Sequence, residues 1–461
     1  MKFTKFGKAL LMGALSAGVM ISITSCIQSY SVGYLYVTGT VTAQTSGNGI
    51  VSGFSIDHNT GKLTAIHGLP VSSGGANPVR AVLLTGSRFL YVLNRGANST
   101  GGDCTTANPC ANANITEFAV GADGILSAQG TFYTQGINPF RLFADGSGNY
   151  LYALDHDSIG QDGQNPATPQ NPNTSCGLAL GNGSNGKPLT VCGDITTFKI
   201  DSTTGRLTLL QNAQVTAANG TPLAYFPVPA NPVDFVFAQG SILTLSGSAA
   251  TNYPYTGGSS IFPYSYNGST GQLTISQNSP QVLGIGAGTA LSYSGSYLYV
   301  LDNEPLTVNG ITAPSQILPY QVSTGGSLAA QTGGPVQDDV TLSNPIAMLV
   351  ESKGKWAYVA NQGNNTGTSG TAQSGIAGYV LDPSTKVLTT LPGEPFGSGA
   401  APQCIVEDPS NQFIYEANFN DSTVTGRLVD QNSGELNNLA GGSSFPLTGP
   451  PTYCLMDGRT N

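Results

Sequence analysis

The residues best equipped for chemistry stand at the ends of short, repeated segments of this chain. His156 follows Asp155 near the end of the segment Tyr150–Asp157. Because an imidazole gains and loses a proton near neutral pH, this pair can serve as a general base with an orienting carboxylate. Arg80 and Arg141 occupy equivalent positions in two successive repeats, and guanidinium groups bind carboxylates or phosphates bidentately. Together the four side chains suit an anionic substrate that needs proton transfer.

Each of these side chains also has a plain structural interpretation. Arg141 can form an ion pair with Asp234 of the next repeat, and a histidine at a loop entrance is commonly only solvated. We expect the ligand to be bound by the two arginines, by Asp234, and by residues at the ends of the repeated segments. These last residues are Asn94, Arg95 and Asp302.

A weak metal signal lies in the same region. Asp155, Asp157 and Asp162 offer hard oxygen ligands of the kind that calcium prefers. Their spacing departs from the helix-flanked loop of calcium sensors, and the closing Glu is missing. We expect no cofactor.

A strand repeated seven times must position these residues. Its central residues are Tyr36, Tyr91, Tyr152, Thr244, Tyr299, Tyr358 and Tyr415. Positions 152 and 244 lie 92 residues apart, whereas the other neighbours are 55 to 61 residues apart, so one repeat carries an insertion. A fixed period of this size is typical of repeat architectures.

Each repeat predicts four strands, A to D. An Asn-Pro pair such as Asn77-Pro78 opens strand A, the tyrosine lies in strand B, and an Asp-x-x-Thr-Gly turn joins strands C and D. Seven equal sheets favour an all-β, seven-bladed β-propeller with four-stranded antiparallel blades. The chain begins at a strand B, and Gly449–Asp457 matches a strand A, so the last strand should complete the first blade and close the ring.

The long B–C loops all emerge on one face, around the mouth of the central channel. Long loops on a rigid scaffold are where binding usually resides. The cysteines predict staples in two of these loops and one across the closing junction: Cys104 with Cys110, Cys176 with Cys192, and Cys404 with Cys454. In the last pair, a register offset of one residue turns the side chains toward each other across neighbouring blades. Two reduced core cysteines are the alternative there.

The first 25 residues are expected to be a leader peptide. Lysines precede the apolar stretch Ala9–Ile23, and Ile23-Thr24-Ser25-Cys26 resembles a lipobox, in which Cys26 is acylated. An ordinary secretory signal is the alternative. We therefore expect a tether at 26–30, a propeller over 31–461, and a lipid-anchored protein of the cell envelope, with Ile27 favouring the outer membrane.

The charge of the chain indicates which kinds of molecule it does not bind. The formal net charge is −9 and there is no basic run, which argues against nucleic acid. An even number of cysteines besides Cys26 suits an oxidising compartment. We expect a monomer that touches the membrane through its lipid only, with a small molecule, a glycan or a protein as its ligand.

The tyrosine strand, the Asn-Pro pair and the Asp-x-x-Thr-Gly-x-Leu hairpin together resemble the lactonase-like seven-bladed propellers, also described by their YVTN repeat. The resemblance covers residues 31–457. That family includes 6-phosphogluconolactonases, a muconate-cyclising enzyme and surface proteins. Its enzymes use a histidine with acidic and arginine residues at the channel mouth, which implies roles for Arg80, Arg141, Asp155 and His156, although no strand A here contains histidine.

Two functions follow from these observations. The first, which is the one we expect, is a binding or interaction module of the cell envelope that uses the B–C loop face, and the other is its alternative. The second is a hydrolase of lactones or related esters, in which His156 is the base, Asp155 orients it, and Arg80 and Arg141 hold an anionic substrate. Whether the chain is an enzyme depends on whether these side chains meet.

Overall fold

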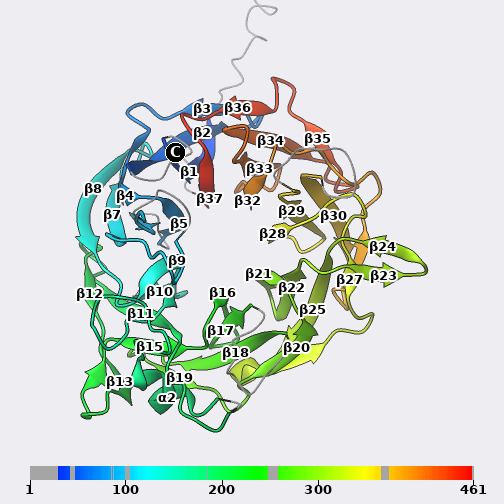
Figure 1. Ribbon diagram of the computed structural model, residues 1–461. Coiled ribbons are helices and arrows are strands. Elements are labelled where there is room, and N and C mark those ends of the chain that lie inside the picture. Colours follow the sequence, from blue (N-terminus) through cyan, green and yellow to red (C-terminus); the bar gives the residue numbers. More distant parts are fainter. Residues whose placement is uncertain are drawn as a thin grey trace, which may run out of the picture.

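The computed structural model describes residues 30–41, 47–84, 86, 88–98, 104–183, 185–247, 258–364 and 373–458. These residues form seven antiparallel sheets arranged in a ring, with strand A of each sheet innermost (Figure 1). The seven-bladed propeller predicted from the repeat is confirmed.

The first four blades contain these strands, in the order A to D. Blade 1 holds β37 (Pro451–Asp457), β1 (Ser31–Gly39), β2 (Asn48–Asp57) and β3 (Leu63–Ala65). Blade 2 holds β5 (Pro78–Leu83), β6 (Phe89–Asn94), β7 (Asn114–Val120) and β8 (Leu126–Phe132). Blade 3 holds β9 (Ile137–Ala144), β10 (Tyr150–Asp157), β11 (Gly193–Ile200) and β12 (Leu207–Leu209). Blade 4 holds β16 (Pro232–Ala238), β17 (Ser241–Ser246), β18 (Ser259–Tyr266) and β19 (Leu273–Ile275).

The last three blades repeat the pattern. Blade 5 holds β21 (Gly288–Ser294), β22 (Tyr297–Asp302), β25 (Gln316–Val322) and β26 (Leu328–Ala330). Blade 6 holds β28 (Pro345–Val350), β29 (Trp356–Asn361), β30 (Gly375–Leu381) and β31 (Leu388–Thr390). Blade 7 holds β32 (Pro402–Glu407), β33 (Phe413–Asn418), β34 (Thr423–Val429) and β35 (Leu436–Asn438).

Short additional elements decorate the blades. In five blades, strand C also pairs with a short strand that follows strand D in the sequence. These strands are β4 (Val71–Ala76), β15 (Tyr225–Val228), β20 (Gln281–Ile285), β27 (Val336–Gln337) and β36 (Ser444–Pro446). Two hairpins and two helical turns complete the described elements: β13 (Asn212–Thr216) with β14 (Pro222–Leu223), β23 (Leu306–Val308) with β24 (Ile311–Ala313), α2 (Thr174–Leu180) and η1 (Thr324–Gly326).

The two ends of the chain close the ring as the sequence predicts. The first strand, β1, lies between β2 and the last strand, β37. All three predicted disulfides are present, and Cys404–Cys454 joins strand A of blade 7 to strand A of blade 1. No sheet edge is left open at this junction, and a covalent bond supports the hydrogen-bonded closure.

The Asn-Pro pairs set the path of the chain into strand A. The residue before the proline has a left-handed backbone with φ between 54° and 58° in five blades, at Asn77, Asn138, Asn231, Asn344 and Ala401. Asparagine is among the residues that adopt this conformation most readily, which explains its recurrence. A β-bulge follows at once, for example between Pro78 and Arg80. Bulges redirect the side chains that follow them, so this step aims residues such as Arg80.

One hydrogen bond links most blades to their successors. The hydroxyl of the central tyrosine in strand B donates to the carbonyl of the turn glycine between strands C and D of the next blade. The pairs are Tyr36–Gly124 at 2.7 Å, Tyr91–Gly205, Tyr152–Gly271 at 3.0 Å, Tyr358–Gly434 at 2.7 Å and Tyr415–Gly61 at 2.7 Å. The tyrosine strand and the Asp-x-x-Thr-Gly turn, two separate motifs in the sequence, are therefore the two halves of one contact.

The same contact explains why the turn residue is glycine. Gly434 has a φ of 79°, and a Cβ there would lie 2.6 Å from the ring of Trp356, the first aromatic residue of the preceding strand B. At Gly61 a Cβ would meet the ring of Phe413 at 2.5 Å. Both the positive φ and the close ring exclude a larger residue.

The direction of the strands separates two faces. Strand B of blade 1 begins beside the C–D turn of its own blade, where the Tyr30 ring stacks on His58 at 4.4 Å. The B–C loops, including the one that holds the Cys104–Cys110 bridge, leave the opposite end of each blade. The chain therefore enters the propeller on the face away from the B–C loops.

The predicted leader, and Cys26 with it, lies outside the described residues. Within the described part of the chain, no helix has the length and apolar character needed to cross a membrane.

Replacing Tyr415 by phenylalanine tests the inter-blade hydrogen bond. We expect Tyr415→Phe to lower the free energy of unfolding by about 1 kcal/mol, because the buried Gly61 carbonyl loses its donor. Denaturant unfolding measures this change. The matched control is Tyr299→Phe, since the described structure gives the Tyr299 hydroxyl no such bond. Equal losses in the two variants would contradict the assignment.

Candidate functional site

The two candidate arginines lie next to each other on the innermost strands of blades 2 and 3. Arg141 follows the bulge of β9, and its Nε donates to Asp234 of blade 4 at 2.9 Å. Removal of the guanidinium from water lowers the pKa of Arg141, Asp234 opposes this shift, and the positive charge of Arg80 adds to it. Asp234 in turn accepts hydrogen bonds from the backbone of Phe235 and Leu291. Arg141 thus forms the inter-blade ion pair that the sequence left as an alternative.

Arg80 has a different environment. Its guanidinium lies 4.2 Å from the centre of the Tyr453 ring and 5.8 Å from that of Phe143. Among the described residues no carboxylate lies within ion-pair distance of it. A cation held over aromatic faces keeps its charge available. Arg80 is therefore the arginine able to receive an anion.

His156 has a carboxylate partner, but it is Asp157 and not the predicted Asp155. The His156 Nδ1 lies 3.1 Å from the Asp157 Oδ2, with 28% of the histidine side chain exposed and only 6% of the aspartate. Burial alone raises the pKa of Asp157, but contacts with His156, Thr106 and Asn138 outweigh it and hold the value below its usual range. The carboxylate is thus kept charged beside the imidazole.

A stapled loop from the neighbouring blade fixes Asp157. Thr106, inside the Cys104–Cys110 loop of blade 2, donates to Asp157 at 2.7 Å. Asn138 donates to the same carboxylate at 2.7 Å and accepts from the backbone of Cys110 at 2.9 Å. The disulfide loop therefore positions the partner of His156.

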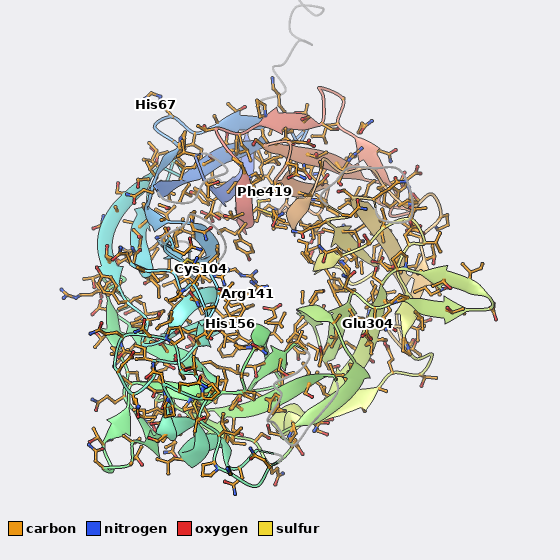
Figure 2. All side chains as sticks on the ribbon, viewed as in Figure 1. His67, Cys104, Arg141, His156, Glu304 and Phe419 are labelled. Carbon is orange, nitrogen blue, oxygen red and sulfur yellow. A yellow bond between two sulfur atoms is a disulfide. The ribbon has the colours of Figure 1, made fainter. Side chains whose placement is uncertain are left out.

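Phe140 lies close to both Arg141 and His156. Its ring centre lies 5.2 Å from the Arg141 guanidinium and 6.2 Å from the His156 ring. Figure 2 places both Arg141 and His156 on the inner side of the ring. We call Arg80, Arg141, Phe140, His156 and Tyr453 the axial cluster. With Asp157 beside His156, it combines positive charge, aromatic surface and a histidine–carboxylate pair.

Asp155 has a structural environment instead of the catalytic one expected from its position. It is fully buried and accepts hydrogen bonds from Thr134 at 2.7 Å and Thr196 at 3.3 Å. It also lies opposite Asp194 in the sheet, and that aspartate is fully buried too. Burial raises the pKa of Asp155 to about 7; burial and the charge of Asp155 raise the pKa of Asp194 well above its usual range. The two carboxyls lie opposite each other in strands B and C, where burial favours a shared proton over two charges.

The other predicted ligand-binding residues bond to neighbouring groups of the protein, mostly within their own blades. Asn94 is fully buried and donates to Ser73 and Asn114. Asp302 is fully buried and accepts from Gln316 at 2.7 Å. Arg95 donates to the carbonyl of Cys104 at 3.0 Å. Because buried polar groups must find partners within the protein, these contacts favour a structural role over the ligand binding that the sequence suggested.

The weak metal signal is not supported by the geometry. Asp155 faces Thr134, Asp157 faces His156, and Asp162 is exposed and bonds to the backbone of its own turn. No group of three or more suitable side chains converges within the described residues. Residues that a short spacing brings together in sequence are here turned in different directions.

Sequence reasoning missed the roles of Asp157, Asp194 and Phe140. Asp155 and Asp157 flank His156 equally, and only the contacts from Asn138 and Thr106 select Asp157. Asp194 opens strand C opposite Asp155, so the pairing of strands B and C is the signal that can find it.

The chain belongs to the lactonase family of seven-bladed β-propellers. The model of that family, described as "Lactonase, 7-bladed beta-propeller", matches residues 34–160 and 258–449, more than half of the chain. A search of curated protein sequences found none that matches this chain. The interval between the two matched parts contains the insertion of the third repeat.

Solved structures of the same fold are similar over nearly their whole length. The periplasmic gluconolactonase PpgL of Pseudomonas aeruginosa is 15% identical, with a TM-score of 0.61 over 92% of this chain and 99% of that one. A proposed 6-phosphogluconolactonase of Bacteroides uniformis gives the same identity, TM-score and coverage. A protein of Lactobacillus plantarum is also 15% identical, with a TM-score of 0.56 over 92% and 99% of the two chains. At this identity the likeness concerns the fold.

The buried Asp155–Asp194 pair predicts a stability that falls as pH rises. A carboxyl whose pKa is raised in the folded state stabilises the protein below its unfolded value of 3.8, and this contribution is lost as pH rises toward about 7. We expect Asp194→Asn to reduce the loss of unfolding free energy between pH 4 and pH 8 by about 2–4 kcal/mol. Denaturant unfolding at several pH values checks it.

Asp162→Asn is the control for this experiment, because Asp162 is exposed and its pKa is lowered by hydrogen bonds in its turn. It should leave the pH dependence in this window unchanged. An Asp194→Asn protein with the pH dependence of the unaltered chain would show that the pair does not share a proton.

Proposed function

We propose that this protein is an exported hydrolase that opens lactones or related esters of small acids at the axial cluster. The observation that carries the proposal is that His156 Nδ1 lies 3.1 Å from the Asp157 carboxylate, while the Phe140 ring lies near both His156 and Arg141. A histidine oriented by a buried carboxylate is the usual form of a general base. Membership of the lactonase family supports the same reaction class.

The chain's own residues account for each proton movement. Nδ1 of His156 faces Asp157 at 3.1 Å, and in the proposed step Nε2 takes a proton from water. The resulting hydroxide attacks the lactone carbonyl carbon, and the ring C–O bond breaks as the tetrahedral oxyanion collapses. The proton on His156 then passes to the departing alkoxide, which gives the hydroxy acid. Arginine charge next to the carbonyl stabilises the oxyanion.

Arg80 and the aromatic rings favour a small anionic or strongly polar substrate. The guanidinium of Arg80 is held over Tyr453 without a carboxylate partner among the described residues. The rings of Phe140 and Tyr453 provide apolar surface beside it. The gluconolactonase activity named for the similar Pseudomonas aeruginosa structure suggests glucono-δ-lactone as the first substrate to try.

The proposal places the enzyme in the cell envelope, anchored through acylated Cys26. Three disulfides support an oxidising compartment. Tyr30, the first described residue, lies against His58 on the face opposite the B–C loops. With a tether as short as 26–30, that face would lie toward the membrane, and the axial cluster would open away from it.

A second candidate is a binding module that holds a small anion without turning it over. The cation–π contacts of Arg80 favour it, because they preserve a charge for binding independently of the histidine. This candidate predicts that ligand affinity depends on Arg80 and is unaffected by loss of His156.

Hydrolysis of glucono-δ-lactone by the full chain, with and without His156, tests the proposed function. We expect His156→Ala to lower kcat roughly 100-fold or more, since general-base catalysis is worth about 10²–10⁴-fold. Asp157→Asn should lower kcat less and alter its pH profile. Arg80→Met should raise KM about 10-fold, the cost of one charge-assisted hydrogen bond.

His67→Ala is the matched control, because this histidine is exposed and Figure 2 places it at the outer edge of the ring. It should keep the rate of the unaltered chain. Equal rates for His156→Ala and His67→Ala would reject the hydrolase proposal. Lactone or gluconate binding that persists without turnover would favour the second candidate.

A further inference from the structure

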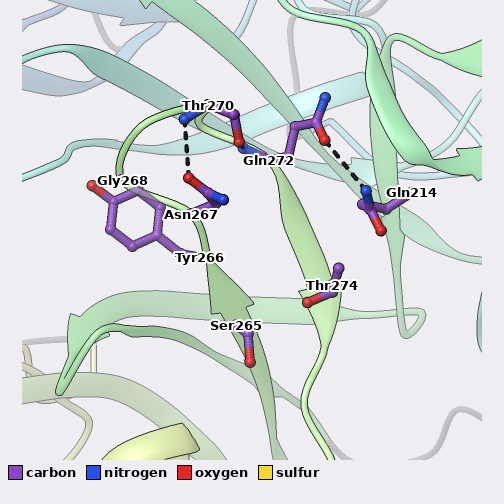
Figure 3. A pocket seen from close by; sticks show the side chains of 8 residues that line it. All are labelled: Gln214, Ser265, Tyr266, Asn267, Gly268, Thr270, Gln272 and Thr274. Atoms are coloured by element: carbon purple, nitrogen blue, oxygen red, sulfur yellow. Dashed lines mark hydrogen bonds between the residues drawn. The ribbon is translucent and has the colours of Figure 1, made fainter.

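An outer groove lies far from the axial cluster, where the insertion of blade 3 meets blade 4. It consists of two adjoining cavities of about 520 and 330 Å³ that share Gln214 and Thr274. Figure 3 shows the larger one, beside the turn between β18 and β19. The smaller one extends toward α2. Together they fall within the roughly 300–1,000 Å³ that ligand sites occupy.

The groove exists because one repeat departs from the common pattern. Its wall comes from α2 and the β13–β14 hairpin, which belong to the long third repeat. The Cys176–Cys192 bridge fixes α2, and the Asn173 side chain caps the helix by accepting from Ser175. Asn212 donates to the carbonyl of Leu273 at 3.3 Å and so attaches the hairpin to β19. The walls are thus held in place by covalent and polar contacts.

The lining of the groove is entirely uncharged. Amides and hydroxyls such as Gln214, Gln272 and Thr274 line one part of it, and Phe226 and Ile275 line another. The hydrogen bond that the Gln214 side chain donates to the Gln272 side chain is long, at 3.5 Å, so both amides can still bond to a ligand. Two large aliphatic side chains of the groove are exposed, Leu178 at 61% and Ile275 at 43%.

We propose that this outer groove binds a neutral oligosaccharide. A sugar ring presents hydroxyls at its edge and apolar C–H groups on its faces, and the groove offers neutral hydrogen-bonding groups next to aliphatic surface. An ionic ligand would find no opposite charge there. Two adjoining cavities that share Gln214 and Thr274 offer room for several linked sugars. The site is separate from the axial cluster and does not depend on hydrolase activity.

Binding of neutral glucose hexamers to the full chain tests the proposal. Maltohexaose, cellohexaose and laminarihexaose are titrated by calorimetry, with a glycine–serine hexapeptide as a neutral ligand that is not a sugar. We expect saturable binding of at least one hexaose and none of the peptide. Thr274→Arg, which places a long charged side chain where the cavities join, should weaken binding at least 10-fold.

Thr64→Arg is the matched control. Thr64 is the exposed threonine at the same position of strand D in blade 1, so the substitution has the same chemistry away from the groove. It should leave hexaose binding unchanged. The proposal is overturned if no hexaose binds, if the peptide binds equally well, or if Thr274→Arg and Thr64→Arg bind alike.

Discussion

The hydrogen bond from a strand B tyrosine to the turn glycine of the next blade recurs around the ring, from Tyr36 on Gly124 to Tyr415 on Gly61. It joins neighbouring blades at five of the seven junctions, because donor and acceptor come from different sheets. The innermost strands of these blades are positioned by the same packing. Arg80, Arg141 and Asp234 belong to three consecutive blades, and their contacts require those blades to meet in a constant register.

The features that all seven repeats share form the propeller, and the residues that differ between repeats form the candidate sites. Each blade has the position after the bulge, yet only blades 2 and 3 place arginine there. Only blade 3 ends strand B with a histidine, and the stapled loop of blade 2 reaches across to Asp157. The outer groove likewise depends on the one long repeat. Both proposed sites therefore arise where repeats differ from the common pattern: blades 2 and 3 at the axial cluster, and the long third repeat at the outer groove.

The sequence was sufficient for the fold because its signals are local and repeated. The tyrosine strands, the Asn-Pro pairs and the offset of Cys404 against Cys454 each predict a feature that the structure confirms. It was insufficient for the site, because Asp155 and Asp157 flank His156 alike. Contacts from Asn138 and Thr106, distant in sequence, decide between them. Asp194 was missed because its meaning depends on lying opposite Asp155.

The most direct test of the account is a crystal structure of the full chain soaked with gluconate, the acid that lactone opening would release. We expect ordered gluconate at the axial cluster, with its carboxylate in contact with Arg80 and a polar atom within hydrogen-bond distance of the His156 Nε2. Gluconate bound elsewhere, or none at the cluster at saturating concentration, would contradict it.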